Sequence, residues 1–182
     1  MVTGKLEVIC GPMFSGKTEE LLRRIKRAEI GGRPFYLVKP DLDSRYSKDK
    51  VASHSGIRKE CYVRNTEGLE TMFKSVEPCL IGIDEVQFYG DRLVQILEDL
   101  LKRGFRIVVA GLDMDSEAKP FGPLPQLMAI ANSVDKLTAV CSMCGEDATH
   151  TFRKSANPAQ ILVGASVEYE ARCRSLWYSG RG

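Results

Sequence analysis

Residues 11–18 limit what this chain can fold into more than any other segment. Their sequence, GPMFSGKT, fits the pattern G-x-x-x-x-G-K-[ST] of a phosphate-binding P-loop. Residues 6–10 in front of the loop, apolar except for Glu7, predict a short strand, and the apolar spacing behind it, at Leu21, Leu22 and Ile25, predicts a helix. Strand, glycine loop and helix follow in the order that a P-loop requires. The chain is therefore predicted to contain a nucleotide-binding α/β sheet.

The chemistry of such a loop depends on its backbone and on its last two residues. Glycines let the backbone N–H groups turn toward phosphate oxygens, at the positive end of the following helix. The lysine of the motif, Lys17, neutralises the β- and γ-phosphate oxygens, and the hydroxyl of Thr18 binds Mg²⁺. The segment therefore predicts a site for a nucleotide with its magnesium ion.

The rest of the main domain alternates between strands and helices. Strands are predicted at residues 33–38, 79–83 and 105–110, and helices at residues 66–75 and 91–103. The last two strands are continuous apolar runs, which is typical of strands buried on both faces of a parallel sheet. A long polar loop, of a kind that is often functional, is predicted at residues 40–59. The fold class is therefore α/β, a P-loop parallel sheet flanked by helices.

The composition argues against several classes of partner. A net charge of +2 gives no bulk attraction to nucleic acid, and the sequence has no run of 18 apolar residues that would span a membrane. Residues 1–5 lead into the first predicted strand without a signal peptide, so a cytoplasmic location is expected. Thiols stay reduced in that compartment, and the six cysteines are not expected to form structural disulfides.

A second chemical site is predicted where the strand at residues 79–83 ends. Asp84 and Glu85 follow it directly, at the sheet edge where open α/β folds bind their ligands. Asp84 fits the acidic residue that orients Mg²⁺ beside a P-loop. Neighbouring residues of an extended chain point in opposite directions, so the two carboxylates can take separate roles, one on the metal and one on the nucleophile, whose proton a carboxylate near the γ-phosphate can accept. The alternative is a pair of solvated carboxylates in a turn.

The cysteines near the C-terminus predict a metal site. Cys141 and Cys144 form a C-x-x-C-G knuckle, which presents two thiolates to one Zn²⁺, and Cys173 offers a third. A second C-x-x-C pair would place the fourth ligand at position 176, which is Leu176. His150 and water are candidates for that fourth position. The alternative for the whole site is a set of free cysteines without metal.

The same region suggests a division into two domains. From Cys141 onward the sequence changes to short β-like runs between turns. We expect a P-loop α/β domain at residues 1–140. Residues 141–182 are expected to form a small zinc-ribbon-like lobe with a loop that encloses the substrate.

Longer motifs resemble a known family. In chain order they are GPMFSGKT at 11–18, KP at 39–40, DSRY at 43–46, SHSG at 53–56, DEVQF at 84–88, GLD at 111–113, KPFG at 119–122, LTAVC at 137–141 and YEARC at 169–173. With them the chain resembles the type II thymidine kinases, the cellular and bacterial cytosolic kind. The resemblance extends over nearly the whole chain, and the combined motifs are far more specific than the P-loop alone.

This resemblance implies ATP-dependent phosphorylation of the 5′-hydroxyl of thymidine to give thymidine monophosphate, with deoxyuridine as a further candidate substrate. It implies that Glu85 is the general base and that Thr18 and Asp84 serve Mg²⁺. The implied ATP-binding residues are Gly11, Pro12, Met13, Phe14, Ser15, Gly16, Lys17, Thr18, Asp84 and Gln87. The implied thymidine-binding residues are Met13, Phe88, Leu112, Phe121 and Tyr169.

The resemblance also implies an assembly and a form of regulation. Members of the family hold the base through backbone groups of a loop, here within residues 158–169. They carry a structural Zn²⁺ in the lobe and usually form homotetramers. Thymidine triphosphate is implied as a feedback inhibitor, and no nucleic-acid or membrane partner is expected. This chain departs from the family at Leu176 and at Ser116, where an aromatic residue commonly walls the pocket.

Two other functions stay open when only the residues are considered. One is a P-loop ATPase that acts on nucleic acid and uses a zinc ribbon as its binding module, although the sequence has no basic stripe interleaved with aromatics to support it. The other is a nucleotide-binding regulator whose cysteine knuckle recruits a partner.

Overall fold

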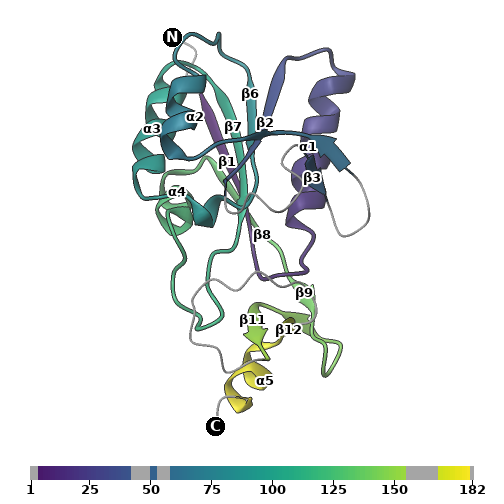
Figure 1. The fold of residues 1–182 in the computed structure, drawn as a ribbon. Helices are drawn as coiled ribbons and strands as arrows, with labels where there is room; N and C mark the ends of the chain where they lie inside the picture. The colour runs from purple at the N-terminus through teal and green to yellow at the C-terminus, as the bar shows by residue number, and fades with distance from the viewer. Residues whose placement is uncertain (1–3, 42–49, 53–57, 155–167, 181–182) are drawn as a thin grey trace.

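The computed structural model describes residues 4–41, 50–52, 58–154 and 168–180. It contains a parallel sheet between two layers of helices, with a small lobe beside the carboxyl ends of the strands (Figure 1). The predicted α/β fold, with its P-loop parallel sheet and flanking helices, is confirmed.

The central sheet has six strands in the order β5-β2-β6-β7-β1-β8, and every neighbouring pair is parallel. Parallel neighbours need crossover connections, which the helices provide. The carboxyl ends of the strands therefore share one edge, where the P-loop and the Asp84-Glu85 pair both begin. The strands are β1 (Lys5–Cys10), β2 (Phe35–Lys39), β5 (Tyr62–Val63), β6 (Leu80–Ile83), β7 (Arg106–Gly111) and β8 (Ser133–Lys136).

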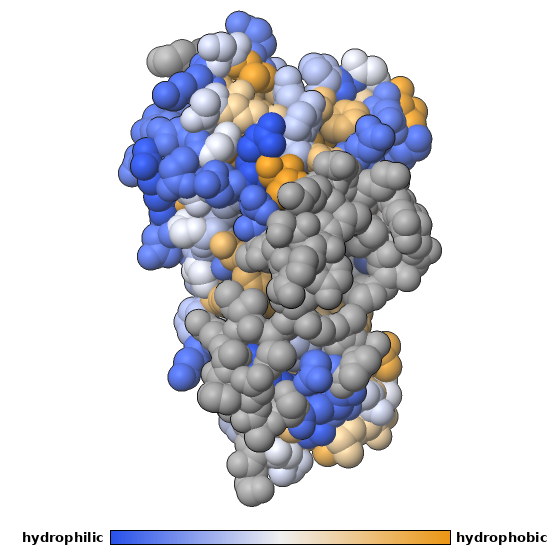
Figure 2. Space-filling view, in the orientation of Figure 1, coloured by the Kyte–Doolittle hydropathy of each residue, from blue (hydrophilic) through white to orange (hydrophobic). Residues whose placement is uncertain are grey.

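The two faces of the sheet are covered unequally. Helices α2 (Thr66–Met72), α3 (Arg92–Lys102) and α4 (Leu124–Ile130) cover one face, where aliphatic and aromatic side chains such as Leu69, Leu93 and Leu124 form the larger apolar core. Helix α1 (Lys17–Ile30) covers the other face and buries Leu21, Leu22 and Ile25 against the strands (Figure 1). The outer surface of the three-helix layer is mostly hydrophilic (Figure 2).

The lobe is built from short antiparallel strands and one helix. Strand β9 (Ala139–Val140) pairs with β10 (Asp147–Ala148), and β11 (His150–Arg153) pairs with β12 (Tyr169–Arg172). Helix α5 (Arg174–Ser179) follows β12 and buries Trp177. One buried apolar cluster of the lobe consists of Ala139, Cys141, Ala148 and Ala171, and Tyr169 is buried as well.

Most predicted elements are present, and the differences lie where local signals are weak. The helix predicted at residues 66–75 ends at Met72. Strands β5 and β8 and helices α4 and α5 were not predicted, because β5 has two residues, β8 is mostly exposed, and α4 and α5 are short. Strands β3 (Lys50–Ala52) and β4 (Arg58–Glu60) pair within the predicted polar loop 40–59. Residues 42–49, 53–57 and most of the predicted base-binding loop at 158–169 lie outside the described residues.

Candidate active site and thiol cluster

The P-loop has the backbone that its glycines predict. Gly11 and Gly16 have φ angles of 142° and 81°, and Phe14 between them has a φ of 67°. A Cβ atom on Gly11 would lie 2.3 Å from the Leu137 carbonyl oxygen, so only glycine fits this approach of loop to strand β8. Helix α1 begins directly after the loop, which places its positive end at the phosphate-binding position.

The two reactive side chains of the loop point to the carboxyl edge of the sheet. The Lys17 ammonium donates to the Pro12 carbonyl over 2.6 Å, inside the loop. Burial lowers the pKa of Lys17, while the negative charges of Glu85 and Asp84 act in the opposite direction. Thr18 Oγ1 lies 3.1 Å from Asp84 Oδ2. The structure thus brings the P-loop and the acidic pair together, as the motifs predict.

Asp84 is buried at the end of β6. Burial raises its pKa to about 7, and the neighbouring charge of Glu85 acts in the same direction. Two oxygen ligands in neighbouring positions of octahedral Mg²⁺, at about 2.1 Å from the ion, lie about 3 Å apart. The 3.1 Å between Thr18 Oγ1 and Asp84 Oδ2 fits that spacing. A hydroxyl and a carboxylate are also suitable ligands for this ion, so the residues present fit Mg²⁺.

Glu85 does not continue the strand. We expected an extended chain here, but Glu85 has a φ of 52° and a ψ of 40°, in the left-handed region, and precedes the short 3₁₀ helix η1 (Val86–Phe88). A non-glycine residue rarely adopts this conformation, which costs of order 1–3 kcal/mol and persists only where the surroundings impose it. The separation of Asp84 and Glu85 therefore arises from a turn, and not from alternation along a strand.

Gln87 fixes the Glu85 carboxylate. Its amide nitrogen donates to Glu85 Oε2 over 2.6 Å, and its amide oxygen accepts from the Leu112 backbone N–H over 3.0 Å. The side chain is buried, and a Cβ on Gly122 would lie 2.1 Å from the Gln87 carbonyl oxygen. Glu85 is therefore tied through one carboxamide to the end of β7.

The residues expected around thymidine fall into two groups. On the sheet side, the rings of Phe88 and Phe121 meet edge to face with centroids 5.5 Å apart, and Leu112 follows β7 beside Gln87. On the lobe side, Tyr169 is buried, and Arg153 donates to its hydroxyl over 3.1 Å. Met13, the remaining expected residue, belongs to the loop between these groups.

The P-loop also contacts the lobe, and no sequence motif predicts this contact. The Met13 backbone N–H donates to Thr151 Oγ1 of β11 over 3.0 Å. The side chain of Phe14 packs against the lobe core, as do Cys173 and Leu176. Thr151 belongs to no recognisable motif, because its neighbour in space is 138 positions away in the chain.

Asp113 is a second residue that the motifs did not assign a role. It lies buried two residues after β7, and its Oδ2 atom is 2.7 Å from the Lys136 ammonium. Asp113 is part of the GLD motif, but no motif predicts that its partner is Lys136 on β8.

Cys141, Cys144 and Cys173 form one thiol cluster. All three sulfur atoms lie within 4.8 Å of one another, and those of Cys144 and Cys173 are 3.8 Å apart. In a tetrahedral zinc site with Zn–S distances of about 2.3 Å, sulfur atoms are about 3.8 Å apart. A hydrogen bond with the Cys173 backbone contributes most to lowering the pKa of Cys141 to about 6, which favours the thiolate that a metal needs. The residues present therefore fit Zn²⁺.

Neither Leu176 nor His150 supplies a fourth ligand to this cluster. Leu176 packs against the lobe core as an apolar residue. His150 lies outside the thiol cluster: its Nδ1 is 2.9 Å from Thr149 Oγ1, and its ring centroid is 5.0 Å from that of Trp177. Within the described residues, the cluster supplies three thiols to a metal.

Comparison with known proteins agrees with the site. A family model described as thymidine kinase matches residues 4–177. A thymidine kinase of Bacteroides thetaiotaomicron is 44% identical over 179 residues, which are 98% of this chain and 89% of the relative. Among the described residues, the structure has no helix with the length and apolar character needed to cross a lipid bilayer.

Proposed function

The chain belongs to the thymidine kinase family, and from this premise we propose how its own residues transfer the γ-phosphoryl group of ATP to the 5′-hydroxyl of thymidine. The observation that carries the proposal is the position of Glu85. Its carboxylate is held at the carboxyl edge of the sheet, next to the Asp84 that faces the P-loop hydroxyl of Thr18. A base beside a phosphate-binding loop is the arrangement that phosphoryl transfer to an alcohol requires.

We assign the general-base role to Glu85. Its carboxylate accepts the proton of the 5′-hydroxyl as the oxygen of that group forms its bond to the γ-phosphorus. The bond from the γ-phosphorus to the β,γ-bridging oxygen breaks, and ADP leaves. Catalysis in such a reaction consists mainly of positioning and charge stabilisation, which is why a rigidly held base matters.

The P-loop binds the phosphates of ATP in this proposal. The backbone N–H groups of residues 14–18 surround them, and the ammonium of Lys17 neutralises charge on the β- and γ-phosphate oxygens. Lys17 reaches this position from the first turn of α1 after exchanging its hydrogen bond to the Pro12 carbonyl for phosphate oxygens.

Thr18 and Asp84 would hold the Mg²⁺ that accompanies ATP. The ion, when bound, supplies charge neutralisation on the phosphate oxygens. The side chains contribute a hydroxyl and a carboxylate that already lie 3.1 Å apart. Because burial raises the pKa of Asp84 to about 7, we expect ion binding to displace a proton from this group at neutral pH.

We propose that Gln87 positions Glu85, in addition to lying in the stretch that the family uses for nucleotide binding. Support comes from its two hydrogen bonds, one to the Glu85 carboxylate and one from the Leu112 backbone. These bonds limit the rotation of the carboxylate, so that its free oxygen faces the substrate.

Thymidine is proposed to lie between the two groups of residues at the sheet and at the lobe. Phe88, Leu112 and Phe121 would contact it from the sheet side, Met13 from the P-loop and Tyr169 from the lobe. The edge-to-face pair of Phe88 and Phe121 supports an apolar wall for the base.

Further properties are proposed on the resemblance to type II enzymes. They are a homotetrameric assembly, feedback inhibition by thymidine triphosphate, a structural Zn²⁺ on Cys141, Cys144 and Cys173, a cytoplasmic location, and a division into domains at residues 140 and 141. The separate core of the lobe supports that division, and the spacing of the thiols supports the metal.

Turnover against a panel of nucleosides with ATP and Mg²⁺ tests the proposal. We expect thymidine to stimulate ADP release and to appear as its 5′-monophosphate, with deoxyuridine as the next best substrate. Stimulation by DNA or RNA in place of nucleosides would instead support the ATPase alternative, and nucleotide binding without turnover would support a regulator.

A further inference from the structure

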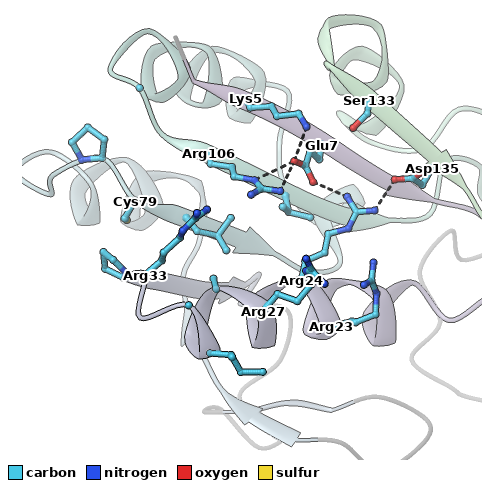
Figure 3. A pocket seen from close by; sticks show the side chains of 18 residues that line it. Lys5, Glu7, Arg23, Arg24, Arg27, Arg33, Cys79, Arg106, Ser133 and Asp135 are labelled. Atoms are coloured by element: carbon cyan, nitrogen blue, oxygen red, sulfur yellow. Dashed lines mark hydrogen bonds and ion pairs between the residues drawn. The ribbon is translucent and has the colours of Figure 1, made fainter. Parts of the chain in front are cut away.

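A wide groove lies on the α1 face of the sheet, at the amino ends of the strands (Figure 3). Its volume is about 1130 Å³, and its walls are the outer turns of α1, the segment after α1, and strands β1, β6, β7 and β8. None of the P-loop residues lines it. The groove is therefore separate from the site proposed for phosphoryl transfer.

The charge of the groove is strongly positive. Six cationic side chains line it, those of Lys5, Arg23, Arg24, Arg27, Arg33 and Arg106, against the two carboxylates of Glu7 and Asp135. Glu20 pairs with Arg23 and Arg24 beside this lining, and with its charge included the net charge of +3 still exceeds the +2 of the entire chain. Cationic charge is thus concentrated in this groove, while the rest of the protein is close to neutral or negative.

Glu7 holds two of these arginines in fixed positions. Its Oε2 accepts from Arg24 Nη1 over 2.8 Å, and its Oε1 accepts from Arg106 Nη2 over 2.8 Å (Figure 3). Lys5 also lies 3.1 Å from Oε1. Burial alone would raise the pKa of Glu7, but Lys5 and Arg106 outweigh it and lower the pKa. The buried Glu7 carboxylate is therefore ionised, and both of its oxygens accept hydrogen bonds. It fixes the positions of Arg24 and Arg106 at the floor of the groove.

Two further arginines have no acidic partner. Arg27 and Arg33 are exposed and form no ion pair with any residue in the described part of the chain. Arg33 extends from the segment after α1 toward the strands that carry Glu7 and Arg106 (Figure 3). Arginines of this kind suit phosphate, because the guanidinium donates two parallel hydrogen bonds to its oxygens.

The lining also indicates which part of a ligand would bind. None of the described residues that line the groove is aromatic. Proteins that bind nucleobases or single strands usually stack the bases on aromatic rings. The groove is thus suited to the phosphate groups of a ligand and has no platform for a base.

We propose that this groove is a second anion site, which binds a small polyanion carrying several phosphate groups. Arg27 and Arg33 contact the ligand directly. Glu7 acts as a positioning residue that orients Arg24 and Arg106. This second site has no part in the transfer of phosphate to thymidine, and it does not rest on that proposed function. Inorganic polyphosphate and the triphosphate of a free nucleotide share the chemistry that the groove recognises.

Calorimetric titration with inorganic triphosphate tests this site. The full chain is first given excess thymidine and one equivalent per chain of a non-hydrolysable ATP analogue, so that the P-loop, as the tighter site for this nucleotide, is filled and the groove stays open. We expect one further binding event per chain, weakened by raising the salt concentration, because exposed charges are screened. The double substitution Arg27→Gln and Arg33→Gln should weaken it at least about tenfold, which corresponds to about 1.4 kcal/mol.

A matched control removes the same charge elsewhere. Lys26 pairs with Glu29 on the outer side of α1, and Lys102 pairs with Asp99 on α3. The double substitution Lys26→Gln and Lys102→Gln should leave triphosphate binding unchanged, and both double variants should keep the wild-type melting temperature and thymidine turnover. The proposal is overturned if no second event occurs, or if the control loses as much affinity as the Arg27 and Arg33 variant.

The two sources of the ligand are separated by a further titration. If ATP and thymidine triphosphate bind the filled enzyme no more tightly than inorganic triphosphate, the groove recognises polyphosphate alone. A nucleotide that binds at least about tenfold more tightly, and still depends on Arg27 and Arg33, is the preferred ligand of the same site. Binding of duplex DNA or of an acidic peptide without any binding of triphosphate would contradict the proposal.

Discussion

The sheet and the C-terminal lobe are stabilised in different ways. Large aliphatic and aromatic side chains fill the core on either side of the sheet, whereas the apolar cluster next to the thiols of the lobe consists of three alanines and a cysteine, with Tyr169 and Trp177 as the large buried side chains of the lobe. Buried apolar area sets the hydrophobic contribution to stability, so small side chains contribute little. The sheet is therefore expected to fold by packing alone, and the lobe to need its thiol cluster.

The two regions also have different proposed roles: the sheet carries the residues of phosphoryl transfer, and the lobe helps to enclose the substrate. Glu85, which we propose as the base, lies with the P-loop and Asp84 at the carboxyl edge of the sheet. The lobe supplies Tyr169 and the contact of Thr151 with the P-loop. Substitutions at the sheet edge should thus change turnover without changing stability, and substitutions at the thiol cluster should do the reverse.

The largest expected effect is that of Lys17→Ala. It removes the cation that stabilises charge on the transferred phosphoryl group, and turnover should fall by at least about 10³-fold. The melting temperature should stay near that of the wild type, since the lysine is outside both apolar cores. Steady-state kinetics and calorimetry measure the two effects. Lys26→Ala, on the exposed side of the same helix, is the control, and near wild-type kcat in Lys17→Ala would refute the P-loop assignment.

Glu85→Gln should lower kcat by about 10²–10⁴-fold, the usual effect of losing a general base. Binding of ATP, followed by fluorescence titration, should be little changed. The substitution preserves the size of the side chain, so the fold should be retained. A rise in KM with kcat preserved would mean that another group accepts the proton.

Gln87→Leu should lower kcat by about 10- to 10²-fold, because a displaced base loses its alignment with the hydroxyl. The KM for ATP is the discriminating measurement. If Gln87 acts by holding Glu85, the KM for ATP stays close to the wild-type value. If its main role is contact with the nucleotide, the KM rises and kcat is affected less.

Removing metal from the thiol cluster should unfold the lobe and leave the sheet intact. After treatment with a chelator, hydrogen exchange of the amides of β9–β12 and α5 should accelerate, while those of β1, β6 and β7 stay protected. Mass spectrometry of peptide fragments measures both, and metal analysis should find about one zinc per untreated chain. Unchanged exchange in the lobe would show that its packing, with Trp177 buried, is sufficient.

Leu176→Cys should have the smallest effect, a gain of about 2–4 °C in melting temperature with zinc present, equivalent to about 1 kcal/mol. A fourth thiolate would complete the tetrahedral set and replace an apolar residue of the small core. The control is the same variant without zinc, in which the gain should disappear. No gain with zinc would mean that position 176 does not turn toward the cluster.

Much of this site follows from the sequence because its parts are local. The P-loop, the Asp84-Glu85 pair and the C-x-x-C knuckle are each encoded by neighbouring residues at fixed spacing, and each lies where its motif predicts. The contacts that join them are not local. Met13 meets Thr151, Asp113 meets Lys136, and Gln87 meets Leu112, and no periodicity links the members of these pairs.

The same limit applies to secondary structure and to conformation. Strand β8 is mostly exposed and contains a single strongly apolar residue, Val134, so the alternation that marks a strand is weak. The left-handed conformation of Glu85 contradicts the local preference of glutamate and is imposed by its surroundings. The groove of arginines is assembled from a helix and four strands, and the nearly neutral net charge of the chain gives no indication of its local charge.

The hydrogen bond between Met13 and Thr151 couples phosphate binding at the P-loop to the folding of the lobe. The loop gives its N–H group to the lobe, and Phe14 contributes its ring to the lobe core. If an ordered lobe raises the affinity of the P-loop for phosphate by some factor, bound phosphate raises the folding equilibrium constant of the lobe by the same factor. A more stable lobe in turn binds its metal more tightly. The affinity of the thiol cluster for metal is therefore expected to increase as the nucleotide concentration is raised.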